Sequence, residues 1–184
     1  MSKVAICMAD GCEEIEGLTV VDVLRRGGME IDMVSISGDP YVTGSHNISF
    51  CADKLISEVN WAEYDGIALP GGIPGTPNLL ANPEVVDALK LFAAEEKLIA
   101  AICAAPSVLG QVGLLEGKKA TSYPGFAEKM PGCQYQTDAV VSDGNIITSR
   151  GMGTAIAFAL AIVEYFLDHE TAVSLGEKFM YHYE

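Results

Sequence analysis

Cys103 stands at a point where a reactive thiol is expected. The stretch 100–109 reads AAICAAPSVL and predicts a buried strand that runs directly into a helix. A thiol at the start of a helix faces the positive end of the helix dipole, which lowers the thiol pKa and favours the nucleophilic thiolate. A free cysteine is also a common core residue, so this stretch alone is equally compatible with a buried structural thiol.

Backbone amides and a carboxyl group elsewhere in the chain can assist such a nucleophile. Gly71 and Gly72 follow an apolar strand, where their N–H groups can stabilise a developing oxyanion, although a simple turn also explains the pair. Glu16 is the candidate for proton transfer, and a solvated glutamate in the first turn of a helix is its alternative interpretation. No histidine stands in a context that places it beside Cys103, so a Cys–His dyad is poorly supported.

Strands and helices alternate along the predicted chain. Short apolar runs predict strands at 4–8, 30–37, 66–69 and 98–102, and turn signals predict hairpins at 41–51 and 139–148. Apolar spacing and terminal signals predict helices at 14–26, 76–80, 83–96, 104–112, 155–167 and 171–179. In the first helix, we expect one apolar face from residues spaced by three: Ile15, Leu18, Val21 and Leu24.

This alternation indicates the α/β class, with a mostly parallel sheet and helices on both faces. In such sheets, ligands bind outside the carboxyl ends of the strands. The loops after Met8, Leu69 and Ile102 leave strands at that edge. They lead to the glutamates of the first helix, the Gly-Gly pair and the thiol, so we expect these groups to converge.

Length and composition narrow the class of protein. The 184 residues suit one domain spanning 1–184, with 49% hydrophobic residues. The sequence shows neither a membrane-spanning apolar stretch nor a signal peptide, so we expect a cytoplasmic protein with no membrane partner. The net charge of -14 argues against nucleic acid as a partner. The five cysteines are odd in number and fit no metal-binding spacing, so we expect reduced thiols, no metal and no cofactor.

Six stretches in a consistent order cover most of the chain: GCEEIE (11–16), VDVLRRGG (21–28), LPGG (69–72), AAICAAP (100–106), TSRGMGT (148–154) and FALAIVE (158–164). Together they resemble the ThiJ/PfpI superfamily, which is related to the class I glutamine amidotransferases. The chain is similar in particular to the branch that contains the Parkinsonism-associated deglycase.

This resemblance implies a flavodoxin-like three-layer sandwich that forms a homodimer. It also implies that Cys103 is the nucleophile and lies on a strand-to-helix nucleophile elbow. Glu16 is then a protonated carboxylic acid that donates a hydrogen bond to the sulfur. The amides of Gly72 and Ala104 match the oxyanion donors of the family.

The resemblance also implies further residues that line this pocket, and Gly71 is one of them. Arg26 matches an arginine near the dimer interface and the cysteine pocket, and Cys51 matches a cysteine near that interface. Two residues depart from the family pattern: Tyr123 replaces the usual histidine, and His46 replaces an arginine of the early hairpin. The first departure argues against a papain-like protease mechanism, and the second removes a group that binds anions.

The function implied by the resemblance is a cysteine-dependent, glutathione-independent glyoxalase or deglycase. It acts on 2-oxoaldehydes such as methylglyoxal, or on their adducts, and requires neither metal nor nucleotide. The alternative is a redox-sensing stress protein or chaperone that acts through oxidation of Cys103. An amidase or peptidase is a weaker alternative. Arg150, in TSRGMGT, is interpreted as a structural hydrogen-bonding residue rather than a substrate contact.

Overall fold

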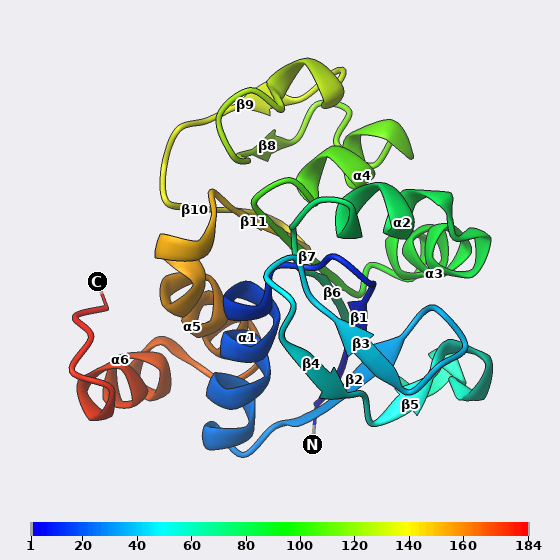
Figure 1. Cartoon of the computed structure of the whole chain (residues 1–184). Coiled ribbons are helices and arrows are strands. Elements are labelled where there is room, and N and C mark those ends of the chain that lie inside the picture. The colour runs from blue at the N-terminus through cyan, green and yellow to red at the C-terminus, as the bar shows by residue number, and fades with distance from the viewer. Residues whose placement is uncertain (1, 184) are drawn as a thin grey trace.

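A seven-stranded sheet forms the centre of the computed structural model, which describes residues 2–183 (Figure 1). The strands are β1 (Lys3–Met8), β2 (Glu30–Ser35), β3 (Tyr41–Thr43), β4 (Ser49–Cys51), β5 (Lys54–Leu55), β6 (Gly66–Leu69), β7 (Leu98–Ile102), β8 (Lys119–Ala120), β9 (Gln134–Tyr135), β10 (Val140–Asp143) and β11 (Ile146–Ser149). The order in the main sheet is β10-β11-β7-β6-β1-β2-β5. Its neighbours are parallel except for the β10–β11 hairpin.

Helices cover both faces of this sheet and complete three layers (Figure 1). They are α1 (Glu14–Arg26), α2 (Gly75–Ala81), α3 (Pro83–Ala94), α4 (Pro106–Gln111), α5 (Ala155–Phe166) and α6 (His169–Lys178). α1 packs against α5 and α5 against α6 on one face, whereas α2, α3 and α4 lie on the other. The predicted α/β sandwich with a mostly parallel sheet is confirmed.

The sheet separates two hydrophobic cores because successive side chains of a strand point to opposite faces. In β1, Val4, Ile6 and Met8 belong to the core under α1 and α5, whereas Ala5 and Cys7 belong to the core under α3. β6 and β7 are buried along their whole length, as expected of strands that are covered on both sides. These packed strands fix the position of the loops at their carboxyl ends.

α1 has the predicted bounds, but only Val21 and Leu24 of its predicted apolar face are buried. Ile15 is 50% exposed and Leu18 is partly exposed, whereas Leu24 is fully buried. The buried side contains positions 17, 20, 21 and 24, a helical repeat that begins with a glycine. An added Cβ at Gly17 would lie 2.7 Å from Met8 Cε, so the absent side chain lets the helix approach the sheet. Ile15 and Leu18 therefore remain on an open surface of α1.

The other predicted elements are present with small shifts at their ends. The two predicted hairpins form as the antiparallel pairs β3–β4 and β10–β11. The sequence pattern does not predict β5, β8 and β9, because two residues are too few to show a period. None of the helices between residues 2 and 183 is long and apolar enough to span a membrane.

Candidate active site

The loops that follow β1, β6 and β7 meet at the carboxyl edge of the sheet, as the topology predicts. The Gly71 N–H donates to Glu16 Oε2 over 2.8 Å, and the Glu13 N–H donates to the Gly71 carbonyl over 2.9 Å. These bonds join the first turn of α1 to the loop after β6. An added Cβ at Gly71 would lie 2.7 Å from Cys103 Cβ and 2.8 Å from Glu16 Oε2. Gly71 therefore marks the point where Glu16 and Cys103 come together.

Cys103 turns the chain sharply between β7 and α4. Its φ of 64° lies in the left-handed region, which costs a non-glycine residue roughly 1–2 kcal/mol. The Cys103 N–H donates to the Ser149 carbonyl over 2.9 Å, and the Tyr123 N–H donates to the Cys103 carbonyl over 2.8 Å. These bonds hold the turn. α4 begins at Pro106, so the predicted start of this helix at residue 104 is too early.

Glu16 is a fully buried carboxyl group beside this thiol. Burial raises the pKa of Glu16 to about 7, although hydrogen bonds with the Cys103 side chain and the Gly71 amide act in the opposite direction. The negative charge of Glu13 adds to the rise. The Oε1 atom of Glu16 is buried without a nitrogen or oxygen partner among residues 2–183, which suits an oxygen that carries a proton. Glu16 can therefore gain and lose a proton near neutral pH.

The Cys103 thiol does not have the lowered pKa that the sequence predicts. Burial raises its pKa to about 12, and the charge of Glu16 and a hydrogen bond with that carboxylate add to the rise. α4 has six residues and begins three positions after Cys103, so its dipole acts weakly on the sulfur. Protonation of Glu16 removes the charge that opposes ionisation. Protonation of Glu16 therefore favours the thiolate, while burial of the sulfur still opposes it.

Two backbone amides point at the sulfur, at the positions predicted for oxyanion donors. Hydrogen bonds from the amides of Ala104 and Gly72 lower the pKa of Cys103, against the effect of burial. Gly72 has a φ of 92°, and an added Cβ there would lie 2.4 Å from the Glu13 nitrogen and 2.5 Å from the Gly11 carbonyl oxygen. Only glycine fits this position, so the amide is held in place by the backbone around it.

Gly151 lies beside the Cys103 sulfur, and Tyr123 lies beside Gly151. Cys103 is partly exposed and Tyr123 is 52% exposed. An added Cβ at Gly151 would lie 3.9 Å from Cys103 Sγ and 3.4 Å from Tyr123 Cδ2. A cavity of about 280 Å³ adjoins this point and is lined by Tyr123, Pro124, Arg150, Gly151, Met152, Gly153 and Thr154. Tyr123 therefore lines a cavity whose wall also contains Gly151, the neighbour of the sulfur.

His46 contacts the start of α1, whereas Arg26 lies at the far end of this helix. The exposed His46 ring places Nδ1 3.2 Å from Glu14 Oε2 and 3.5 Å from Glu13 Oε2. Arg26 pairs with Asp22, Nε to Oδ2 over 2.6 Å, at the far end of α1. Glu16 and Arg26 are ten positions apart, which corresponds to about 15 Å along the helix. Arg26 therefore does not approach the thiol of its own chain. It could lie near the thiol of a second copy only in the expected homodimer.

The ligand atoms of Glu13, Glu14 and His46 lie within 4.8 Å of one another, which makes these residues a possible cation-binding group. The Glu14 carboxylate already accepts the His46 N–H over 2.8 Å. Burial acts to raise the pKa of Glu14, but hydrogen bonds from the backbone and from His46 outweigh it and lower the pKa. Glu14 therefore acts as an anchor for the β3–β4 loop, and we assign no metal to it.

Ser149 and Gly151 also lie beside Cys103, and the spacing of the motifs does not predict this. Both lie at the carboxyl end of β11, which pairs in parallel with β7. The order of strands within a sheet is not written in the local sequence. The signal that points to them is the stretch TSRGMGT, which follows a strand and precedes a helix.

A family and several known proteins resemble this chain. The DJ-1/PfpI family matches residues 2–165. Protein DJ-1 homolog B of Arabidopsis thaliana is 41% identical over 176 residues. The match covers 95% of this chain but only 40% of the length of that relative. A deglycase of Pyrococcus abyssi is 32% identical over 164 residues, which cover 88% of this chain and 98% of the relative. The solved structure of oxidized Toxoplasma gondii DJ-1 has a TM-score of 0.96 and 38% identity, with 100% of each chain covered. The chain therefore belongs to the DJ-1/PfpI family.

Proposed function

We propose that the protein is a cysteine-dependent enzyme that converts 2-oxoaldehydes such as methylglyoxal to 2-hydroxy acids without glutathione. The observation that carries this proposal is the pairing of the partly exposed Cys103 thiol with the buried Glu16 carboxyl. The pKa of Glu16, about 7, suits a group that exchanges protons near neutral pH. The deglycase name of the Pyrococcus abyssi relative supports carbonyl chemistry on this scaffold.

The reaction begins when the Cys103 thiol gives its proton to the Glu16 carboxylate and the sulfur attacks the aldehyde carbon. The aldehyde oxygen gains negative charge, which the N–H groups of Gly72 and Ala104 stabilise. Glu16 then returns the proton to this oxygen, and a hemithioacetal results. Glu16 is a suitable proton carrier because the same carboxyl contacts the thiol and lies beside the amide of Gly71.

An isomerisation and a hydrolysis complete the reaction. The Glu16 carboxylate removes the proton from the former aldehyde carbon, an enediol forms, and a proton returns to the former ketone carbon. The product is a lactate thioester on Cys103. Water adds to its carbonyl, the carbon–sulfur bond breaks, and lactate leaves the free thiol. One methylglyoxal and one water give one lactic acid, so no oxidant or reductant is consumed.

The direct test is an assay of the purified protein with methylglyoxal in the absence of glutathione. We expect lactate, measured by NMR, to appear in an amount equal to the methylglyoxal lost. Loss of methylglyoxal without lactate would contradict the proposal, because it would indicate simple adduct formation. A peptide first treated with methylglyoxal, used as the substrate in a parallel sample, tests the deglycase form of the same chemistry.

Oxidation of Cys103 to a sulfinate is a second candidate function, favoured by the oxidized state of the Toxoplasma gondii neighbour. We expect mild peroxide to add two oxygen atoms to Cys103 first, because amides donate to its sulfur and Glu16 can donate to a sulfinate. Cys7 and Cys12 are buried, whereas Cys51 is exposed and Cys133 partly exposed. Intact-mass measurement and peptide mapping check this result. Equal oxidation of Cys51 and Cys133 would count against a selective redox sensor.

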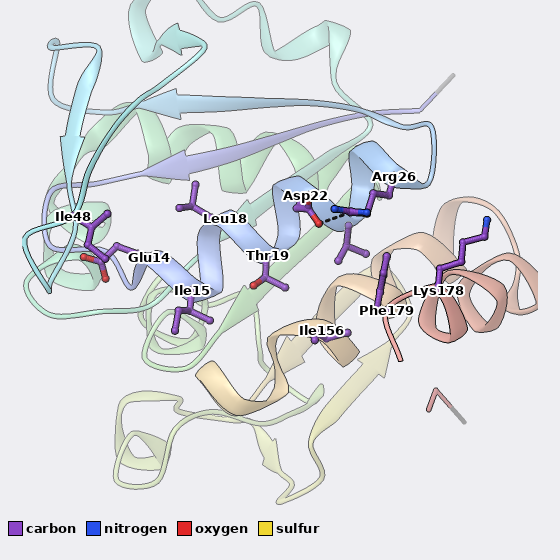
Figure 2. A pocket seen from close by; sticks show the side chains of 11 residues that line it. Glu14, Ile15, Leu18, Thr19, Asp22, Arg26, Ile48, Ile156, Lys178 and Phe179 are labelled. Atoms are coloured by element: carbon purple, nitrogen blue, oxygen red, sulfur yellow. Dashed lines mark hydrogen bonds and ion pairs between the residues drawn. The ribbon is translucent and has the colours of Figure 1, made fainter. Parts of the chain in front are cut away.

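A homodimer is also proposed, with the open surface of α1 as its interface. A groove of about 670 Å³ runs along this helix (Figure 2). Its apolar lining includes Ile15 and Leu18 from α1, Ile48 from the β3–β4 hairpin, Ile156 from α5 and Phe179 after α6. An apolar groove on a chain with a net charge of -14 is typical of a surface that another protein covers. The expected dimer of the family provides that cover.

Replacement of Ile15 by glutamate is expected to shift the protein from dimer to monomer. Ile15 is 50% exposed in the groove, so the change leaves the core of the chain intact while it places a charge in the interface. Size-exclusion chromatography with light scattering measures the mass of each species. Leu91→Glu is the matched control, because Leu91 is 38% exposed on α3, away from the groove. A dimeric mass for both variants would exclude this surface as the interface.

A further inference from the structure

Arg150 is a cation without an acidic partner in a strongly acidic chain. Arg25, Arg26 and Arg150 are the arginines of the sequence. Arg25 pairs with Asp53 over 2.7 Å, and Arg26 pairs with Asp22 over 2.6 Å. Within the described part of the chain, the Arg150 side chain has no ion pair, and its Nη1 atom is buried without a hydrogen-bond acceptor. The structural hydrogen-bonding role expected from the sequence is therefore not found.

The position of Arg150 relates this unpaired cation to the thiol. Arg150 follows β11, whose last residue Ser149 pairs with Ile102, the residue before Cys103. Arg150 and Cys103 thus occupy equivalent places at the carboxyl ends of adjacent parallel strands. Arg150 lines the cavity of about 280 Å³ that Tyr123 and Gly151 also line. Gly151 lies between this cavity and the thiol, since an added Cβ there would contact both Tyr123 and Cys103 Sγ.

A buried guanidinium nitrogen without an acceptor is uncommon, because native proteins satisfy nearly all buried polar groups. The Arg150 side chain as a whole is only partly buried and lines a cavity near the nucleophile, where its charge can pair with an anionic part of the substrate. Guanidinium groups bind carboxylates through paired charge-assisted hydrogen bonds. A carboxylate would otherwise be repelled by a protein with a net charge of -14, so a local cation has a clear effect on which substrates enter.

We propose that Arg150 binds a carboxylate at the end of the substrate remote from the aldehyde. This inference rests on the proposed function and narrows its substrate class to 2-oxoaldehydes that carry a carboxylate. Methylglyoxal then contains the reacting part of the substrate but lacks the part that Arg150 recognises. Arg150 sets specificity, whereas Cys103 and Glu16 carry out the chemistry.

The first test compares methylglyoxal with 4,5-dioxopentanoate, a 2-oxoaldehyde with a terminal carboxylate whose hydrated product is 2-hydroxyglutarate. We expect wild-type kcat/KM to be at least about tenfold higher for the carboxylate substrate, mainly through KM. Arg150→Met is expected to abolish this preference, so that the ratio of the two kcat/KM values falls to about one. Arg150→Lys is expected to keep part of the preference, since it keeps the charge but loses the paired geometry.

The control variant is Arg25→Met, which removes an arginine that pairs with Asp53 and lies outside the cavity. It is expected to keep the wild-type preference. An Arg150→Met protein that still prefers the carboxylate substrate would overturn the proposal. So would a wild-type protein that turns over both substrates equally.

A second test does not depend on turnover and therefore separates this inference from the proposed function. Iodoacetate and iodoacetamide alkylate a thiolate by the same displacement of iodide, but only iodoacetate carries a carboxylate. We expect Arg150→Met to lower the iodoacetate rate at Cys103, relative to the iodoacetamide rate, by at least about threefold. An unchanged ratio would contradict the anion site. A lowered ratio in a protein that converts neither aldehyde would support the site and refute the enzyme.

Discussion

Cys103→Ala is expected to lower the conversion of methylglyoxal to lactate by at least about a thousandfold, because it removes the atom that forms the covalent intermediate. The fold itself should tolerate the change. The side chain is partly exposed, and alanine occupies less space than cysteine in the crowded contact with Gly71. Steady-state lactate production, measured by NMR at saturating methylglyoxal, gives the comparison with wild type.

Matched cysteine variants show whether this effect belongs to one thiol. Cys51 is exposed and Cys133 is partly exposed, and both lie outside the site formed by Glu16 and the Gly71 loop. Cys51→Ala and Cys133→Ala should each retain wild-type turnover within about twofold. Wild-type turnover in Cys103→Ala would remove the proposed mechanism, since no other described thiol contacts the Glu16 carboxyl.

Glu16→Gln is expected to change how stability depends on pH. The folded protein holds the Glu16 proton with a pKa of about 7, against the ordinary value of 4.5. Between these pH values the folded state binds more protons than the unfolded chain, so the free energy of unfolding falls as pH rises. The fall amounts to about 3 kcal/mol for this group. Glutamine keeps an oxygen for the Gly71 N–H but does not ionise, so the variant lacks this loss.

Urea denaturation at pH 4.5 and pH 8 measures the effect. The unfolding free energy of Glu16→Gln, relative to wild type, should rise by about 3 kcal/mol over this range. Glu128→Gln is the control, because Glu128 is exposed and its substitution should leave the pH profile unchanged. Parallel profiles for wild type and Glu16→Gln would show that folding does not raise the pKa of this carboxyl. The glutamine variant should also lose turnover, because it cannot accept the thiol proton.

Local pattern is sufficient to predict most of the elements and the loops that bring Glu16, Gly71 and Cys103 to one edge of the sheet. The predicted bounds of 14–26 match α1, and the predicted strands 66–69 and 98–102 match β6 and β7. The loops after these strands deliver Gly71 and Cys103 to one edge, which follows from parallel topology alone. The convergence of Glu16 with Cys103 was therefore predictable once the first helix was placed after the first strand.

The features that could not be predicted depend on packing between distant segments. Ile15 and Leu18 fit the apolar period of a helix, but the side of α1 that contacts the sheet is set by Gly17 and its contact with Met8. The pKa of Cys103 depends on burial and on the Glu16 charge, which the local sequence of the elbow does not contain. The helix dipole and a protonated Glu16 both favour the thiolate, whereas burial of the sulfur, which the sequence does not show, raises its pKa.

The left-handed backbone at Cys103 limits which residues evolution can place there. A β-branched side chain is strongly disfavoured at a φ of 64°, so threonine and valine are excluded by the main chain before any question of reactivity arises. Serine is unbranched at Cβ and keeps the hydroxyl in the position of the thiol. A lineage that exchanged sulfur for oxygen at this elbow would therefore have to pass through serine, and its descendants would retain the shape of the turn.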